Sequence, residues 1–96
     1  LVKLKKIIKY IIMKNILMYS GPMCAFCDAA KRLLLRNNLQ YKEIDISTKD
    51  GLRDEMIKKA NGRRTIPQIF FDNEHVGGYQ ELRALEKDGK LINSLK

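Results

Sequence analysis

The hydrophobic and polar positions in the first half of the chain change spacing twice. Residues 14–19 form a short apolar run that ends at Gly21 and Pro22, which predicts a strand. Over residues 24–37 the apolar positions recur at helical spacing and basic side chains lie between them, which predicts a helix. The inward positions would be Phe26, Ala30, Leu33 and Leu34. Residues 41–46 predict a second strand, and because a helix connects it to the first, we expect the two strands to be parallel.

The second half of the chain predicts a helix, a hairpin and a last helix. Ser47 or Thr48 is expected to cap a helix that runs to about residue 60. The short apolar runs 67–72 and 75–77 are separated by a polar turn and should form an antiparallel hairpin. A Gly-Gly pair then opens a helix over about residues 80–88. The order of elements is βαβ-α-ββ-α, which predicts an α/β domain with one sheet covered by helices.

The first twelve residues have a pattern of their own. Residues 1–12 place apolar side chains at helical spacing between lysines, and Met13 follows directly. The segment is too short and too rich in lysine to span a membrane, and it lacks the cleavage site of a signal peptide. We interpret it as a leader or N-terminal extension outside the domain at 13–96. A helix that binds a membrane surface weakly, or a targeting helix, is the alternative.

Composition and charge narrow the class of protein. The chain has 96 residues, enough for one small domain, and 45% of them are hydrophobic. Its net charge is +8, but four of these charges lie in residues 1–12, which leaves +4 for the domain. Arginines and aromatic residues do not form the stripe that nucleic-acid binding needs, so we expect no nucleic-acid partner. We also expect no stable association with membranes.

The chemistry of the chain is concentrated in its two cysteines, Cys24 and Cys27, at the start of the first predicted helix. A thiol is nucleophilic as its thiolate, and a helix N-terminus lowers the pKa of a thiol. Positions i and i+3 of a helix place their Cα atoms roughly 5 Å apart, which suits a disulfide. One cysteine can therefore attack a substrate disulfide and the other can resolve the mixed disulfide. A Cys-x-x-Cys near a βαβ pattern indicates redox chemistry in a reducing compartment, so we expect a cytoplasmic protein.

Two other uses of the cysteine pair fit less well. A zinc site needs four ligands, and the sequence offers only His75 besides the cysteines. A purely structural disulfide between residues three apart would constrain almost nothing. We therefore expect no metal requirement.

Several motifs in register resemble the glutaredoxin family, in particular its small bacterial dithiol members. They are the Cys-Ala-Phe-Cys at 24–27, Thr-Ile-Pro at 65–67, Gln-Ile-Phe-Phe-Asp at 68–72 and His-Val-Gly-Gly at 75–78. The resemblance covers about residues 14–96. It implies a thioredoxin-like fold with a four-stranded mixed sheet, and a monomeric enzyme that uses glutathione as co-substrate. The implied partners are glutathione and proteins that carry disulfides or glutathione adducts.

The resemblance also implies roles for individual residues. Cys24 would be the nucleophile that becomes glutathionylated, Cys27 the resolving thiol and Pro67 a cis-proline that faces them. The residues implied to contact glutathione are Phe26, Arg64, Thr65, Ile66, Pro67, Gly78, Tyr79, Gln80 and Glu81.

Several of these residues can also be interpreted as structural, with no contact to a ligand. The residue before a proline is extended, so Ile66 can present its N–H and C=O to a ligand, yet Pro67 could merely open a strand. Gly77 and Gly78 let a ligand approach the backbone ahead of a helix, yet two glycines are often only a turn. Phe26 would line the groove, or it could belong to the core.

Three departures from the family pattern affect these expectations. Ala25 stands where the family usually has proline, and in some dithiol members a small residue at this position accompanies a glutathione-ligated [2Fe–2S] cluster that bridges a dimer. A cluster protein, with Cys24 as ligand, is therefore the alternative function. Gly21 stands where many members have a lysine, so Arg63 or Arg64 would have to anchor a carboxylate of glutathione. Gln80 and Glu81 stand where the family often has an acidic residue that meets the γ-glutamyl ammonium group of glutathione, so Glu81 or backbone contacts would have to serve. A thioredoxin is disfavoured because the chain has no tryptophan.

Overall fold

The computed structural model describes residues 13–96, so the interpretation of residues 1–12 lies outside the described part of the chain. The elements are β1 (Ile16–Ser20), α2 (Ala25–Arg36), β2 (Lys42–Asp45), α3 (Leu52–Lys59), β3 (Gln68–Phe71), β4 (Glu74–Gly77), α4 (Tyr79–Lys87) and α5 (Leu91–Ser94). The predicted order of elements is confirmed. Within residues 13–96, no helix has the length and apolar character that crossing a membrane requires.

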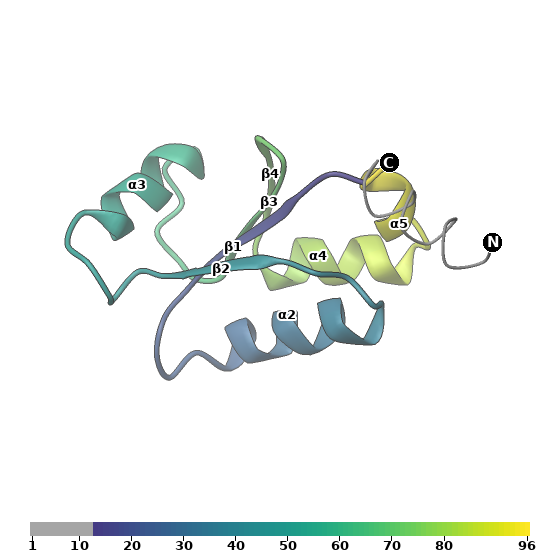
Figure 1. The fold of residues 1–96 in the computed structure, drawn as a ribbon, viewed down its shortest axis with the longest axis horizontal. Helices are drawn as coiled ribbons and strands as arrows, with labels where there is room; N and C mark the ends of the chain where they lie inside the picture. The colour runs from purple at the N-terminus through teal and green to yellow at the C-terminus, as the bar shows by residue number, and fades with distance from the viewer. Residues whose placement is uncertain (1–12) are drawn as a thin grey trace.

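The four strands form one mixed sheet in the order β2-β1-β3-β4 (Figure 1). β1 and β2 are parallel, as the helical connection between them predicts. β3 is antiparallel to both β1 and β4, and the register of the β3–β4 hairpin shifts between Ile69 and Phe70. Because β1 and β3 are antiparallel neighbours, the loop that follows β1 and the loop that precedes β3 lie at the same end of the sheet.

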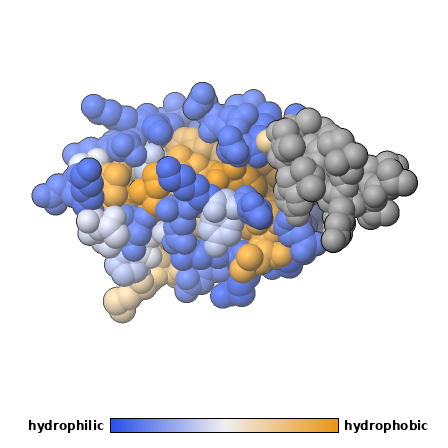
Figure 2. All heavy atoms as spheres, viewed as in Figure 1, coloured by the Kyte–Doolittle hydropathy of each residue, from blue (hydrophilic) through white to orange (hydrophobic). Residues whose placement is uncertain are grey.

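The two faces of the sheet are covered unequally. Side chains on a strand alternate between faces, so Met18 joins the larger core under α2 and α4, whereas Tyr19 joins the smaller cluster beside α3. The larger core includes Ala30, Leu33 and Leu34 of α2. α3 covers only part of the opposite face, and Figure 2 shows apolar side chains at the surface near the middle of the molecule.

α2 and α4 are also joined by a polar contact at their far ends. The carboxylate of Glu86 accepts hydrogen bonds from the Arg36 guanidinium at 2.9 and 2.7 Å and from the Asn37 amide at 2.6 Å. The Arg36 hydrogen bonds, with help from Asn37, lower the pKa of Glu86 to about 2. This contact fixes the packing of the helix that carries the cysteines against the helix that follows Gly78.

The prediction that Ser47 or Thr48 caps the second helix is wrong. Both side chains are held by Asp45, whose carboxylate accepts from the Ser47 hydroxyl at 2.6 Å and whose carbonyl accepts from the Thr48 hydroxyl at 2.7 Å. The chain therefore makes a further turn, and α3 begins after Gly51, which has the positive φ of 87° that glycine tolerates. The helix is shorter than predicted for this reason.

Candidate active site

Cys24 and Cys27 lie where the chain leaves β1 and enters α2. Cys24 is the N-cap residue of the helix, and Cys27 lies in its first turn. Their Cα atoms are 5.2 Å apart and their sulfurs form a disulfide, which is the oxidised state of the pair. Cys27 is only 1% exposed, whereas Cys24 is partly exposed. Cys24 is therefore the sulfur that a bulky substrate can reach.

The polarity around Cys24 comes from the start of α2. The backbone N–H of Cys27 is directed at the Cys24 sulfur, with the nitrogen 3.1 Å away. Amide groups at a helix start stabilise negative charge, and here they would favour the thiolate of the reduced protein. The preceding loop is crowded at Gly21, where an added Cβ would lie 2.8 Å from Cδ1 of Ile66. A side chain at position 21 therefore requires Ile66 to move.

The wall opposite α2 is formed by the segment that leads into β3. The Ile66–Pro67 peptide bond is cis. The carbonyl oxygen of Ile66 lies 3.7 Å from the Cys24 sulfur, so the backbone of this segment borders the reactive thiol. An extended ligand attached to that sulfur can pair with a backbone placed in this way, as an added strand pairs with a sheet edge.

A groove of about 300 Å³ runs beside this wall. It is lined by Phe26, Arg63, Thr65, Ile66, Pro67, Gly78, Tyr79, Gln80 and Glu81. The structure thus brings together eight of the nine residues that the resemblance selects. Phe26 is 57% exposed and stacks on Tyr79, so its placement among the inward positions of α2 is wrong and its placement in the groove is right. Most of the lining comes from residues 63–67 and from the start of α4.

Arg64 is the one selected residue that does not line the groove. Its carbonyl accepts a hydrogen bond from the Arg53 guanidinium at 3.1 Å, and Arg63 lines the groove instead. The difference follows from the turn before it, where Asn61 and Gly62 both have positive φ and reverse the chain after α3. Two adjacent arginines give no local signal for which one faces the groove.

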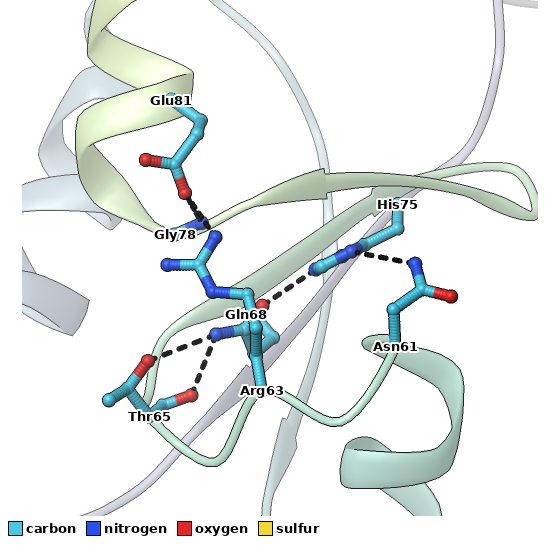
Figure 3. A network of polar contacts seen from close by, with 7 residues as sticks. All are labelled: Asn61, Arg63, Thr65, Gln68, His75, Gly78 and Glu81. Atoms are coloured by element: carbon cyan, nitrogen blue, oxygen red, sulfur yellow. Dashed lines mark hydrogen bonds and ion pairs between the residues drawn. The ribbon is translucent and has the colours of Figure 1, made fainter.

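Glu81 closes the end of the groove and is held from two sides (Figure 3). Its carboxylate accepts a hydrogen bond from the backbone N–H of Gly78 at 2.8 Å and forms an ion pair with Arg63. The Gly78 N–H, followed by Arg63, lowers the pKa of Glu81. A Cβ at Gly77 would lie 2.3 Å from the same carboxylate, so this position has to be glycine for Glu81 to reach back. The groove therefore ends in a fixed pair of opposite charges at the N-terminus of α4.

A sequence model described as Glutaredoxin matches residues 16–76. The chain belongs to the glutaredoxin family. Glutaredoxin 1 of Rickettsia prowazekii is 43% identical over 86 residues, which cover 88% of this chain and 90% of that protein. Glutaredoxin 3 of Escherichia coli K12 is 40% identical over 84 residues, which cover 88% of this chain and 100% of that protein.

A solved structure agrees with the sequence matches. The solution structure of a glutaredoxin from Brucella melitensis has a TM-score of 0.77 and 45% identity, covering 88% of this chain and 91% of that chain. The expected thioredoxin-like fold is confirmed by this similarity. With the pair Cys24 and Cys27 at the start of α2, membership of the glutaredoxin family makes the chain a thiol–disulfide oxidoreductase.

Proposed function

We propose that the protein is a dithiol glutaredoxin that uses glutathione to reduce protein disulfides and glutathione mixed disulfides. The observation that carries the proposal is the groove beside Ile66, whose carbonyl oxygen lies 3.7 Å from the Cys24 sulfur; the groove ends at the charged pair of Arg63 and Glu81. It combines a reachable sulfur, an exposed backbone edge and charged groups at the far end. A tripeptide thiol with carboxylates and an ammonium group needs these three features.

The two cysteines allow thiol–disulfide exchange by two routes. In the one-thiol route, the Cys24 thiolate attacks the glutathione sulfur of a mixed disulfide and releases the protein thiolate. A second glutathione thiolate then attacks the glutathione sulfur bound to Cys24, which releases glutathione disulfide and restores the Cys24 thiolate. In the two-thiol route, Cys24 attacks a protein disulfide and Cys27 displaces the second protein thiolate. This step leaves the Cys24–Cys27 disulfide, and two glutathione molecules reduce it by supplying two electrons.

The walls of the groove suggest how glutathione would lie in it. The cysteinyl part would pair with the backbone of Ile66, beside Pro67. The γ-glutamyl end would lie at the start of α4, where backbone N–H groups favour a carboxylate and Glu81 favours an ammonium group. Arg63 would hold a second carboxylate. Phe26 and Tyr79 would cover the apolar middle of the ligand.

The test is turnover coupled to glutathione, glutathione reductase and NADPH, with a glutathione mixed disulfide and a protein disulfide as alternative substrates. We expect Cys24→Ser to abolish both activities, because it removes the attacking sulfur. Cys27→Ser should keep the first activity and lose the second, because only the protein disulfide needs resolving. An inactive wild type, or full activity of Cys24→Ser, would contradict the proposal.

The cluster alternative rests on Ala25 and is tested separately. Anaerobic reconstitution with iron, sulfide and glutathione would give a brown dimer that needs Cys24 if the protein carries a [2Fe–2S] cluster. We propose instead a monomer that acts in the cytoplasm, and for it we expect a colourless monomer after the same treatment. The measurement is absorbance together with size-exclusion chromatography.

A further inference from the structure

A buried glutamine connects the groove to a histidine outside it (Figure 3). Gln68 is fully buried at the start of β3. Its amide nitrogen donates to the carbonyl of Thr65 at 2.9 Å and lies 3.2 Å from the Thr65 hydroxyl. Because a carbonyl can only accept, the amide nitrogen has to face Thr65. The amide oxygen of Gln68 therefore faces the other way, toward β4.

His75 meets that oxygen. Its Nε2 lies 2.7 Å from the amide oxygen of Gln68, so Nε2 carries the hydrogen and donates it. Its Nδ1 lies 3.4 Å from the amide nitrogen of Asn61, which can donate to it. The neutral imidazole with hydrogen on Nε2 satisfies both contacts at once.

The surroundings of His75 favour the same neutral form. The ring is partly buried and lies with its centroid 5.1 Å from that of Phe70. Burial lowers the pKa of His75, the Arg63 guanidinium lowers it further, and the Glu81 carboxylate opposes them. These two charged residues face the ring from the segment before β3 and from α4. The lowered pKa and the two hydrogen-bond contacts thus favour the same neutral form of His75.

We propose that His75 is a positioning residue that fixes Thr65 through Gln68 and so sets the affinity of the groove for glutathione. The proposal rests on the proposed function. Thr65 lines the groove and is joined to Ile66, whose backbone borders Cys24. Without the His75 donor, the buried oxygen of Gln68 has lost its partner, and a buried acceptor without a partner is costly. The amide then turns or shifts, and Thr65 loses the donor that holds it.

The effect should fall on binding and not on the chemical step. The hydrogen bonds of His75 and Gln68 go to Thr65 and Asn61, whereas Cys24 is bordered by Ile66 and by the start of α2. If a wall of the groove contacts the ligand equally in the ground state and in the transition state, the loss of those contacts raises KM and leaves kcat unchanged.

The experiment compares three variants in the coupled assay with a glutathione mixed disulfide. His75→Phe keeps a ring against Phe70 but removes the donor, and we expect KM to rise about tenfold with kcat within about twofold of wild type. His75→Gln restores an N–H donor at a similar reach and should return KM to within about threefold of wild type. Val76→Ala, on the same strand and partly buried, controls for loss of stability and should leave KM unchanged. An unchanged KM in His75→Phe, no rescue by His75→Gln, or an equal rise in Val76→Ala would overturn the proposal.

A measurement on the wild type keeps the proposal testable if His75→Phe does not fold. The nitrogen chemical shifts of the imidazole distinguish the two neutral tautomers, and we expect hydrogen on Nε2. Hydrogen on Nδ1 would overturn the proposal, because Nε2 would then have no hydrogen to give Gln68. A wild type without glutathione turnover would instead refute the proposed function and the role in affinity together, while the tautomer would still report whether the contact with Gln68 exists.

Discussion

The two walls of the groove are built by different forces. The wall that carries Cys24 and Cys27 is one helix, and it is positioned by side chains buried in the larger core, Leu33 and Leu34 among them. The opposite wall, residues 63–67 with the start of α4, also packs apolar side chains, Ile66 and Leu82 among them. The groups of this wall that face the ligand, however, are held by hydrogen bonds and an ion pair that involve Gln68, His75 and Glu81. The reactive group thus rests on apolar packing, and the groups around the ligand rest on directional polar contacts. Damage to the first wall should appear as lost stability, and damage to the second as lost affinity.

The largest expected effect is on the first wall. Leu33→Ala leaves a cavity under α2, because Leu33 is fully buried, and should lower the free energy of unfolding by about 2–5 kcal/mol. The control is Leu35→Ala on the same helix, where the side chain is 64% exposed and the change should stay within about 0.5 kcal/mol. Denaturant unfolding of the reduced proteins measures both. If the two variants were equally stable, burial would not be what positions the cysteines.

The second wall is tested by the two adjacent arginines. Arg63→Ala removes the partner of Glu81 and a charged group of the groove, and should raise KM for a glutathione mixed disulfide about tenfold. Arg64→Ala removes the same charge outside the groove and should change KM less than about twofold, since exposed single charges contribute little. Steady-state kinetics at one ionic strength decide between them. A larger effect of Arg64→Ala would reverse the assignment of the two residues.

The two walls differ in how much of their structure the sequence predicts. The cysteine wall was predictable, except for the exposed Phe26, because its signals are local: an i, i+3 cysteine pair, a Gly-Pro break and helical spacing of apolar residues. The opposite wall joins residues that the hairpin and the turn at 61–62 bring together. The choice between Arg63 and Arg64, and the contact of Gln68 with His75, depend on that turn and on the shifted register of β3 and β4. The start of α3 was mispredicted for a related reason, since Asp45 competes for Ser47 and Thr48.

The contact between α2 and α4 should make stability depend on acid pH. The pKa of Glu86 is about 2 in the folded protein, below its ordinary value of 4.5, so its ionised form stabilises the fold fully above 4.5. That contribution decreases below pH 4.5 and is lost as the pH falls through about 2. Glu86→Gln should therefore lower stability by about 1 kcal/mol at pH 7, where charge-assisted hydrogen bonds to a partly exposed carboxylate are broken. Thermal unfolding at several pH values tests this, and a difference from wild type that persists at pH 2 would contradict it.

The loop that leads into the cysteine wall comes close to the opposite wall at Gly21 and Ile66, and this close approach allows the smallest effect to be predicted. A lysine at position 21 would bring a cation near Cys24, and the cation should favour the thiolate and lower the pKa of that thiol. Its Cβ would lie 2.8 Å from Cδ1 of Ile66, so in Gly21→Lys the end of the Ile66 side chain has to move, and this movement beside the groove should raise KM slightly. Ile66→Val removes the methyl group in question, Cδ1, and the double variant should keep the lower pKa while KM returns toward that of Ile66→Val.

Gly21→Gln has similar length without charge and should leave the pKa of Cys24 unchanged. The rate of alkylation of Cys24 against pH, in a Cys27→Ser background, gives the pKa. If glutamine lowered it as much as lysine does, the charge would not be the cause; if Ile66→Val brought no recovery of KM, the walls would not be coupled through this contact.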